Sequence, residues 1–160
     1  MTLLLKNLLF TVVVPGTVAV YLPLFIARHR SPASGPMFSI AVLLLAVGGA
    51  IYAWCVWDFA SFGRGTPLPI DAPKRLVVRG LYRYTRNPMY IGVVTVVLGW
   101  AILFRAASLL LYALAAATWI HLFVVFYEER HLRREFGREY ELYRARVGRW
   151  LPRWNRRTAA

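Results

Sequence analysis

The sequence predicts an all-α integral membrane protein, a helical bundle with about four transmembrane helices and a C-terminal amphipathic helix at the membrane interface. Hydrophobic residues make up 59% of the 160 residues, which is more than an ordinary soluble domain contains. Four apolar runs come close to the length of about 20 residues that a helix needs to cross a bilayer. Most of the 20 lysines and arginines lie between and after these runs, as is typical of membrane proteins.

The first two runs predict a pair of anchoring helices. The first, residues 8–27, contains Pro15, Gly16 and Pro23, which a membrane helix tolerates when its neighbours satisfy the freed backbone groups. The second, residues 37–57, has no charged residue and includes three consecutive small residues at 48–50. Small residues allow a neighbouring helix to approach closely, so this stretch predicts a tight helix crossing.

The third and fourth runs, residues 88–104 and 106–127, predict an antiparallel helical hairpin, because only Arg105 separates them. The far ends of a hairpin are neighbours. The sequence therefore predicts that Asn87 and the basic stretch before it lie close to Glu128 and Glu129, on one side of the bilayer.

The whole chain is interpreted as a single membrane domain with four parts. These are two anchoring spans in 1–60, a cytoplasmic loop in 61–87, the hairpin in 88–127 and an amphipathic C-terminal segment in 128–160. The loop and the tail hold most of the arginines, so the positive-inside rule predicts a multi-pass protein with both termini in the cytoplasm. Arg28 and Arg30 count against this orientation, because it places them outside.

The C-terminal segment carries an apolar stripe at helical spacing, formed by Leu132, Phe136, Tyr140, Tyr143 and Val147. Arginines lie largely off the stripe. This pattern predicts a helix that lies on the membrane surface, with Trp150 and Trp154 at the level of the lipid headgroups.

Several classes of protein and site are disfavoured by composition. Cys55 is the sole cysteine, so neither an intrachain disulfide nor a cysteine-based zinc site can form. The three histidines lack metal-ligand spacing, and we expect no metal. The net charge of +13 comes without a nucleic-acid-binding module, so we expect no nucleic-acid partner. Lys6 precedes an apolar run without a clear cleavage site, which predicts a retained first span.

The acidic pair Glu128-Glu129 is unusual, because two carboxylates at the C-terminal end of a helix face the negative end of its dipole. One interpretation is a solvated cluster with Arg130, Arg133 or Arg134. The other is that at least one carboxylate points into the protein and accepts hydrogen bonds from the hydroxyls of a ribose.

The basic stretch before the hairpin also has two interpretations. Asn87-Pro88 fits a helix N-cap followed by proline at the first helical position, and the same helix end offers free N–H groups to an anion. Tyr82, Tyr84 and Tyr90 fit interfacial aromatics, and the basic residues fit lipid anchors or ligands. The predicted meeting of both stretches favours a ligand site over separate anchors.

These two stretches together resemble the isoprenylcysteine carboxyl methyltransferases and the wider group that includes phospholipid N-methyltransferases. The similar motifs are Arg-Asn-Pro-Met-Tyr at 86–90, Glu-Glu-x-x-Leu at 128–132, Phe-Gly-x-x-Tyr-x-x-Tyr at 136–143 and Val-x-Arg-x-x-Pro at 147–152. The resemblance covers roughly the C-terminal half of the chain and includes the spacing between the motifs.

The resemblance implies a membrane methyltransferase that uses S-adenosylmethionine, with residues 61–87 as the cofactor loop and no assigned catalytic residue. The cofactor-binding residues that it implies are Lys74, Arg75, Leu76, Val77, Tyr82, Asn87, Pro88, Met89, Tyr90, Glu128 and, as a helper, Glu129. The implied acceptor is lipophilic and enters from the bilayer: a phospholipid amine, an isoprenylcysteine-like carboxylate or a small thiol.

Two positions depart from the carboxyl-methylating members. Asn87 replaces their histidine, and Val124 stands where they place a substrate-binding arginine. Both departures weaken the expectation of a prenylated carboxylate as acceptor. Two alternatives remain open. One is a membrane reductase that uses NAD(P)H, since sterol reductases carry a similar Arg-x-Pro-x-Tyr element, and the other is a non-catalytic four-helix membrane protein.

Overall fold

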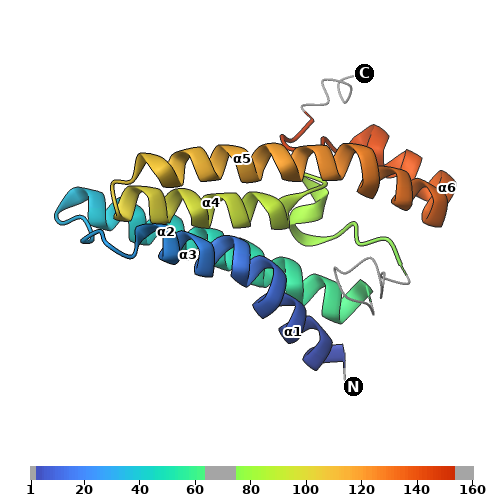
Figure 1. The fold of residues 1–160 in the computed structure, drawn as a ribbon. Helices are drawn as coiled ribbons and strands as arrows, with labels where there is room; N and C mark the ends of the chain where they lie inside the picture. The colour runs from blue at the N-terminus through green and yellow to red at the C-terminus, as the bar shows by residue number, and fades with distance from the viewer. Residues whose placement is uncertain (1–2, 64–74, 154–160) are drawn as a thin grey trace.

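The computed structural model describes residues 3–63 and 75–153, and long helices run side by side through most of this part of the chain (Figure 1). An isolated β-bridge joins Thr85 to Gly148. Helix α1 begins at the end of the bundle that carries α6, opposite the turn between α4 and α5 (Figure 1). The all-α prediction is confirmed.

The first apolar run forms three consecutive helical segments, α1 (Leu3–Gly16), the π-helix η1 (Thr17–Tyr21) and α2 (Leu22–Ala27). The change from α- to π-geometry follows Pro15 and Gly16. Proline has no backbone N–H to give to the α-helical ladder, and a π-helical turn is one way in which a helix accommodates such a fault. The predicted interruption is therefore present, and the helical path continues through it.

Glycines bring the next helix, α3 (Pro36–Asp58), close to α4 (Pro88–Leu103). A Cβ atom at Gly48 would lie 2.7 Å from the carbonyl oxygen of Gly92, and one at Gly92 would lie 2.9 Å from the carbonyl oxygen of Gly48. A Cβ atom at the neighbouring Gly49 would meet nothing within 4 Å. Of these two adjacent glycines, Gly48 is therefore the one that contacts α4. The predicted close crossing is confirmed at Gly48.

Helix α4 and helix α5 (Ala107–Phe123) form the expected hairpin. Arg105 takes the left-handed conformation at the turn, with φ 47°. Past α5, the π-helix η5 (Val124–Glu128) leads directly into α6 (Glu129–Arg146). The hairpin brings the beginning of α4 beside the end of η5, which positions the candidate site.

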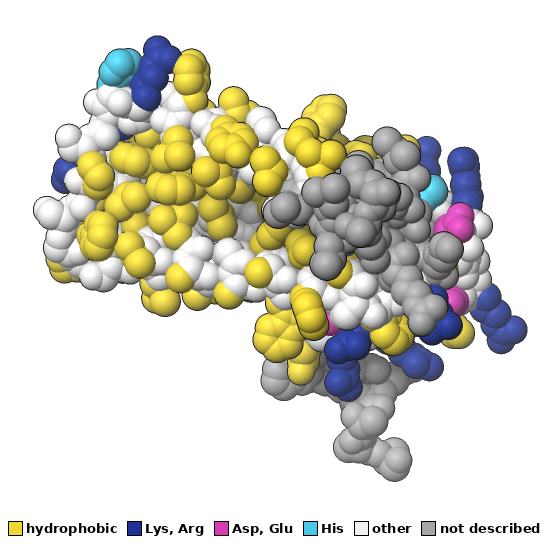
Figure 2. Space-filling model, turned by 90° about the horizontal axis from the view of Figure 1, so that it is seen from below, with side chains coloured by type: hydrophobic (Ala, Val, Ile, Leu, Met, Phe, Trp, Pro, Cys, Tyr) yellow, Lys and Arg dark blue, Asp and Glu magenta, His cyan; other side chains and the backbone are white. Residues whose placement is uncertain are grey.

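Two helices, Pro36–Phe62 and Ala107–Arg146, are long and apolar enough to cross a membrane, and the apolar helices Thr11–Ala27 and Pro88–Leu103 are shorter. Many large hydrophobic side chains are exposed on α1, α3 and α5, and others on α2, with Phe25, Leu43 and Trp119 as examples. Figure 2 shows such side chains along much of the bundle, with most charged groups gathered at one end. This distribution fits a lipid-facing surface, and the number of membrane crossings stays a prediction.

The C-terminal segment departs from the predicted uninterrupted helix. Gly137 has φ 47° and ψ −119°, which breaks α6 into two helical pieces. Arg133 and Glu141, from either side of this kink, form an ion pair at 3.0 Å. Tyr140 is buried, and Val147 is extended, after the helix has ended. The prediction of one continuous stripe was wrong, because glycine allows the left-handed turn that redirects the second piece onto the protein.

Candidate active site

The two stretches singled out in the sequence meet through Tyr90 and Glu128. The hydroxyl of Tyr90, in the first turn of α4, donates a hydrogen bond of 3.0 Å to Oε2 of Glu128, the last residue of η5. These residues are 38 positions apart in the chain, and the hairpin brings them together. The predicted proximity is confirmed.

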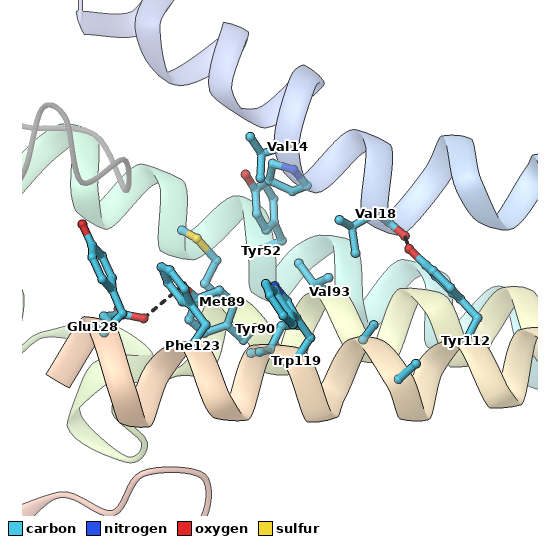
Figure 3. A pocket seen from close by; sticks show the side chains of 15 residues that line it. Val14, Val18, Tyr52, Met89, Tyr90, Val93, Tyr112, Trp119, Phe123 and Glu128 are labelled. Atoms are coloured by element: carbon cyan, nitrogen blue, oxygen red, sulfur yellow. Dashed lines mark hydrogen bonds between the residues drawn. The ribbon is translucent and has the colours of Figure 1, made fainter.

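Glu128 and Tyr90 lie at one end of a cavity of about 590 Å³ (Figure 3). Side chains from several helical elements contribute to its wall, and apolar and aromatic groups predominate. The lining residues are Val14, Pro15, Val18, Tyr52, Met89, Tyr90, Val93, Tyr112, Ala115, Ala116, Trp119, Ile120, Phe123, Tyr127 and Glu128. A large apolar cavity with few polar groups is the usual form of a small-molecule site.

Three of the cofactor-binding residues implied by the resemblance, Met89, Tyr90 and Glu128, line this cavity. Val77 and Tyr82 are buried behind Met89, in a cluster that includes Cys55. Burial raises the pKa of Tyr82 well above its ordinary value, so its hydroxyl stays protonated.

The other expected residues that the structure describes are not among those that line the cavity. Leu76, Asn87 and Pro88 are buried, whereas Arg75 is exposed. Lys74 lies outside the described residues. The structure thus places Met89, Tyr90 and Glu128 at the cavity. Val77 and Tyr82 pack against Met89.

Asn87 takes the N-cap position of α4, but its side chain makes no capping hydrogen bond. Its Nδ2 instead donates to the carbonyl oxygen of Arg149, at 3.0 Å. The position predicted for the cap is correct, and the side chain holds the C-terminal segment. The first backbone N–H groups of α4 therefore receive no side-chain cap from Asn87.

Glu129 points away from the cavity into a cluster of ionic and polar side chains. Its carboxylate accepts hydrogen bonds from Nε and Nη2 of Arg149, at 2.6 and 3.1 Å, and lies 3.2 Å from Nη1 of Arg86. Only 8% of the Glu129 side chain and 7% of the Arg86 side chain is exposed, whereas Arg149 is one-third exposed. The hydrogen bonds to Glu129 raise the pKa of Arg149 further above its ordinary value.

We call residues 147–150 the C-terminal strap, because they cross the segment before α4. The backbone N–H of Arg86 donates to the carbonyl oxygen of Gly148 at 2.9 Å, and Oγ1 of Thr85 donates to that of Arg149 at 3.0 Å. Nε1 of Trp150 donates to Nδ1 of His121 on α5 at 3.1 Å. The strap therefore joins the segment before α4 to the hairpin.

The interpretation of Glu128 and Glu129 as one solvated cluster with the arginines that follow them was wrong. Glu128 bonds to Tyr90, and Glu129 bonds to Arg86 and Arg149. Neighbouring Arg133 pairs with Glu141 instead. Successive helical residues point in different directions, about 100° apart, so adjacent carboxylates reach different partners.

Sequence reasoning did not identify the partners of Glu129 or most of the cavity wall. Arg149 was part of the Val-x-Arg-x-x-Pro motif, but nothing local connects it with Glu129. Another missed residue is Asp58, an isolated acid at the end of an apolar run. Its carboxylate is buried, pairs with Nε of Arg79 at 3.1 Å and lies against Gly80, which has a φ of 55°.

A family model described as "Phospholipid methyltransferase" matches residues 37–139, well over half of the chain. The chain belongs to the phospholipid methyltransferase family. This assignment covers α3, the hairpin and the first half of α6, including the Tyr90–Glu128 contact. The family agrees with the resemblance that the motifs indicated.

The chain is also similar to methanethiol S-methyltransferase 1 of Bradyrhizobium diazoefficiens. The two are 40% identical over 85 residues, which are 52% of this chain and 28% of the relative. The chain thus corresponds to a small part of that protein's length. No solved structure matches the chain.

Val124 stands where the resemblance to the carboxyl-methylating enzymes predicts an arginine. Val124 begins η5, is 1% exposed and is not among the residues that line the cavity. An apolar side chain packed in this way cannot pair with a carboxylate. Val124 therefore supplies no positive charge one helical turn before Glu128.

Proposed function

We propose that the protein transfers a methyl group from S-adenosylmethionine to a lipophilic acceptor at the cytoplasmic face of a membrane. The observation that supports this best is the Tyr90–Glu128 hydrogen bond at one end of a large apolar cavity. A carboxylate beside an apolar cavity costs free energy unless hydrogen bonds compensate for its lost water. A ligand with hydroxyl donors and an apolar ring would provide those hydrogen bonds and fill the apolar space.

The side chains at this end of the cavity fit S-adenosylmethionine. Glu128 would accept hydrogen bonds from the ribose, while Met89, Phe123 and Tyr127 offer apolar and aromatic surface to adenine. Tyr90 orients the Glu128 carboxylate by its hydrogen bond. The backbone N–H groups at the beginning of α4 suit the carboxylate of the methionyl part.

Other residues of the proposed cofactor site have supporting roles. Val77 and Tyr82 pack against Met89, and Leu76 is buried. Asn87 and Pro88 hold the beginning of α4. Lys74 and Arg75 would meet the cofactor from the loop, and Glu129 would help from the strap side. The bound cofactor supplies an electrophilic methyl group on a sulfonium. The chain itself binds the two reactants, aligns them and excludes water.

The membrane arrangement is part of the proposal. Four crossings would place the beginning of α1, the end of α3, the cofactor loop and α6 on the cytoplasmic side, together with both termini. Residues 1–60 would anchor the protein and complete the cavity wall. Residues 61–87, 88–127 and Glu128 would form the cofactor site, and the rest of 128–160 would cover it at the interface. The beginning of α1 and helix α6 lie at the same end of the bundle, which supports this arrangement (Figure 1).

The proposed function is tested by incubating membranes that contain the protein with a donor carrying a labelled methyl group, and identifying the labelled product. We expect a labelled lipophilic product, and less of it at limiting donor concentration when Glu128→Gln replaces the wild-type protein. S-adenosylhomocysteine should also raise the thermal unfolding midpoint of the purified protein, and reduced nicotinamide should not. Stabilisation by reduced nicotinamide alone would favour the reductase, and no stabilisation by either would favour a non-catalytic protein.

A further inference from the structure

The cavity extends well beyond the Glu128 end, and its lining indicates what the acceptor is. We infer that the acceptor presents a thiol or an amine on an apolar chain and carries no anionic group. This inference rests on the proposed function, because it assigns the rest of the cavity to the second reactant of the same reaction.

The first argument is length. Cavity-lining residues on the helix formed by α5 and η5 run from Tyr112 to Glu128. These residues are 16 positions apart, which corresponds to about 24 Å at about 1.5 Å per helical residue. A nucleoside held at Glu128 leaves the Tyr112 end uncovered. That end is therefore available to an extended apolar group.

The second argument is the apolar character of the Tyr112 end. Val18, from η1, lies beside Tyr112 (Figure 3). Val14 from α1 and the small side chains of Ala115 and Ala116 on α5 also line the cavity. Methyl and methylene groups gain free energy when they leave water for such a surface. An alkyl or acyl chain suits this wall better than a polar headgroup does.

The third argument concerns charge and hydrogen-bond donors. Among the fifteen residues that line the cavity, none is lysine, arginine or histidine, and Glu128 is an acid. The hydroxyls of Tyr52 and Tyr112 already donate to Oγ1 of Thr11 at 3.0 Å and to the carbonyl oxygen of Val18 at 2.8 Å. The Tyr90 hydroxyl donates to Glu128.

Two further polar side chains line the cavity, Trp119 and Tyr127, and they are 72% and 48% exposed. These belong to its mouth. A carboxylate or phosphate inside would lose its water without gaining a cation or a free hydrogen-bond donor from the described residues that line the cavity, which is strongly unfavourable. A thiol or an amine avoids this loss, and an ammonium group would be attracted by Glu128.

For a thiol acceptor, the reaction balances with these reactants alone. The acceptor sulfur forms the new S–CH₃ bond, and the S–CH₃ bond of the donor breaks with its electron pair left on the donor sulfur. The thiol proton leaves to water. The products are a methyl thioether, S-adenosylhomocysteine and a proton, and an amine acceptor loses its proton in the same way.

The inference is tested with three probes of equal chain length, hexadecanethiol, hexadecylamine and hexadecanoate, on the protein in nanodiscs. Binding without cofactor is measured by tryptophan fluorescence. A spin-labelled alkyl chain in the cavity quenches Trp119, and a probe that displaces this chain restores the fluorescence. Trp119→Phe is the control for the other tryptophans. We expect the thiol and the amine to displace it at concentrations about tenfold or more below that of the acid. Equal displacement by all three, as for a groove filled by any lipid, would overturn the inference.

Labelled methyl transfer to the same probes provides the second readout. We expect methylation of the thiol or the amine and none of the acid. Methylation of hexadecanoate, or of phosphatidylethanolamine in the nanodisc, would overturn the inference and leave the proposed function standing. S-adenosylhomocysteine that fails to bind at all would instead count against the proposed function.

A cavity-filling variant separates the acceptor end from the cofactor end. Ala116→Phe should weaken hexadecanethiol displacement about tenfold or more while S-adenosylhomocysteine binds as before, because a ring would occupy the apolar end. The matched control is Leu114→Phe, whose side chain is on the same helix, is 66% exposed and lies outside the cavity. Loss of S-adenosylhomocysteine binding in Ala116→Phe alone would contradict the division of the cavity.

Discussion

Glu128 and Glu129 are adjacent carboxylates in two contrasting surroundings. Glu128 faces a large apolar cavity and accepts one hydrogen bond, from Tyr90. Glu129 is paired with two guanidinium groups, Arg86 from the segment before α4 and Arg149 from the C-terminal strap. A charged group with few partners at a cavity is typical of a ligand site, whereas a charged group with every partner supplied by the protein is typical of a structural cluster.

This contrast indicates that the two acids of one motif have different roles. In the proposed function, Glu128 binds a ligand, and Glu129 stabilises the fold. We expect changes at the Glu128 end to alter ligand affinity with little effect on folding. Changes in the Glu129 cluster should alter folding first. Variants of the two residues and of their partners can therefore sharpen the comparison or break it.

The largest expected effect is on stability. Glu129→Ala should lower the free energy of unfolding by about 3 kcal/mol or more, because it leaves the buried guanidinium of Arg86 without its carboxylate. Unfolding by sodium dodecyl sulfate in mixed micelles measures this change. Glu141→Ala is the control, because its ion pairs are nearly half exposed and should contribute less than about 1 kcal/mol. Equal losses in both variants would contradict a structural role for Glu129.

The second effect is on cofactor affinity. Glu128→Gln should weaken S-adenosylhomocysteine binding by about 1 to 3 kcal/mol, since the amide replaces one acceptor oxygen with a donor. Its free energy of unfolding should stay within about 1 kcal/mol of wild type, because it has one protein partner. Calorimetric titration measures the affinity, with exposed Glu135→Gln as the control. An unchanged affinity would place the cofactor elsewhere.

The sequence was sufficient to predict this pairing of motifs because their geometry follows from a short connection. A hairpin with a turn at Arg105 has to bring Asn87 and Glu128 to the same end, whatever the details of packing. Gly48 was predictable for a similar local reason, since a glycine on an apolar helix permits a close crossing.

Other features were not predictable, because they depend on contacts between distant residues. The bond between Asn87 and the Arg149 carbonyl joins residues 62 positions apart, and it replaces the cap that the local sequence indicated. Gly137 carried a local signal, but a glycine within a helical pattern is compatible with either a continuous helix or a kink. The cavity depends on how several helices pack, which periodicity along one helix cannot specify.

A smaller effect is expected from Tyr90→Phe. The variant keeps the ring at the cavity and removes the hydroxyl that orients Glu128, so S-adenosylhomocysteine should bind with about 1 kcal/mol less free energy. The same calorimetric titration measures it. Tyr84→Phe, at a 62% exposed side chain, serves as the control and should not change the affinity. A loss in the control as large as in Tyr90→Phe would remove the special role of this hydroxyl.

The smallest effect is expected from Arg149→Lys. Lysine keeps the charge but cannot reproduce the two hydrogen bonds to Glu129, so the free energy of unfolding should fall by about 1 kcal/mol. Cofactor affinity should not change. Arg153→Lys is the matched control, because that arginine contacts only a backbone carbonyl among the described residues. A weaker cofactor affinity without any loss of stability would show that the strap belongs to the binding site itself.

The most direct test of the central claim is an experimental structure of the full chain with S-adenosylhomocysteine bound in a lipid nanodisc. We predict that the ribose lies within hydrogen-bonding distance of the Glu128 carboxylate, with Tyr90 beside it and the Tyr112 end of the cavity still open. A ligand that contacts Glu129 or the strap and leaves Glu128 bonded only to Tyr90 would contradict the account.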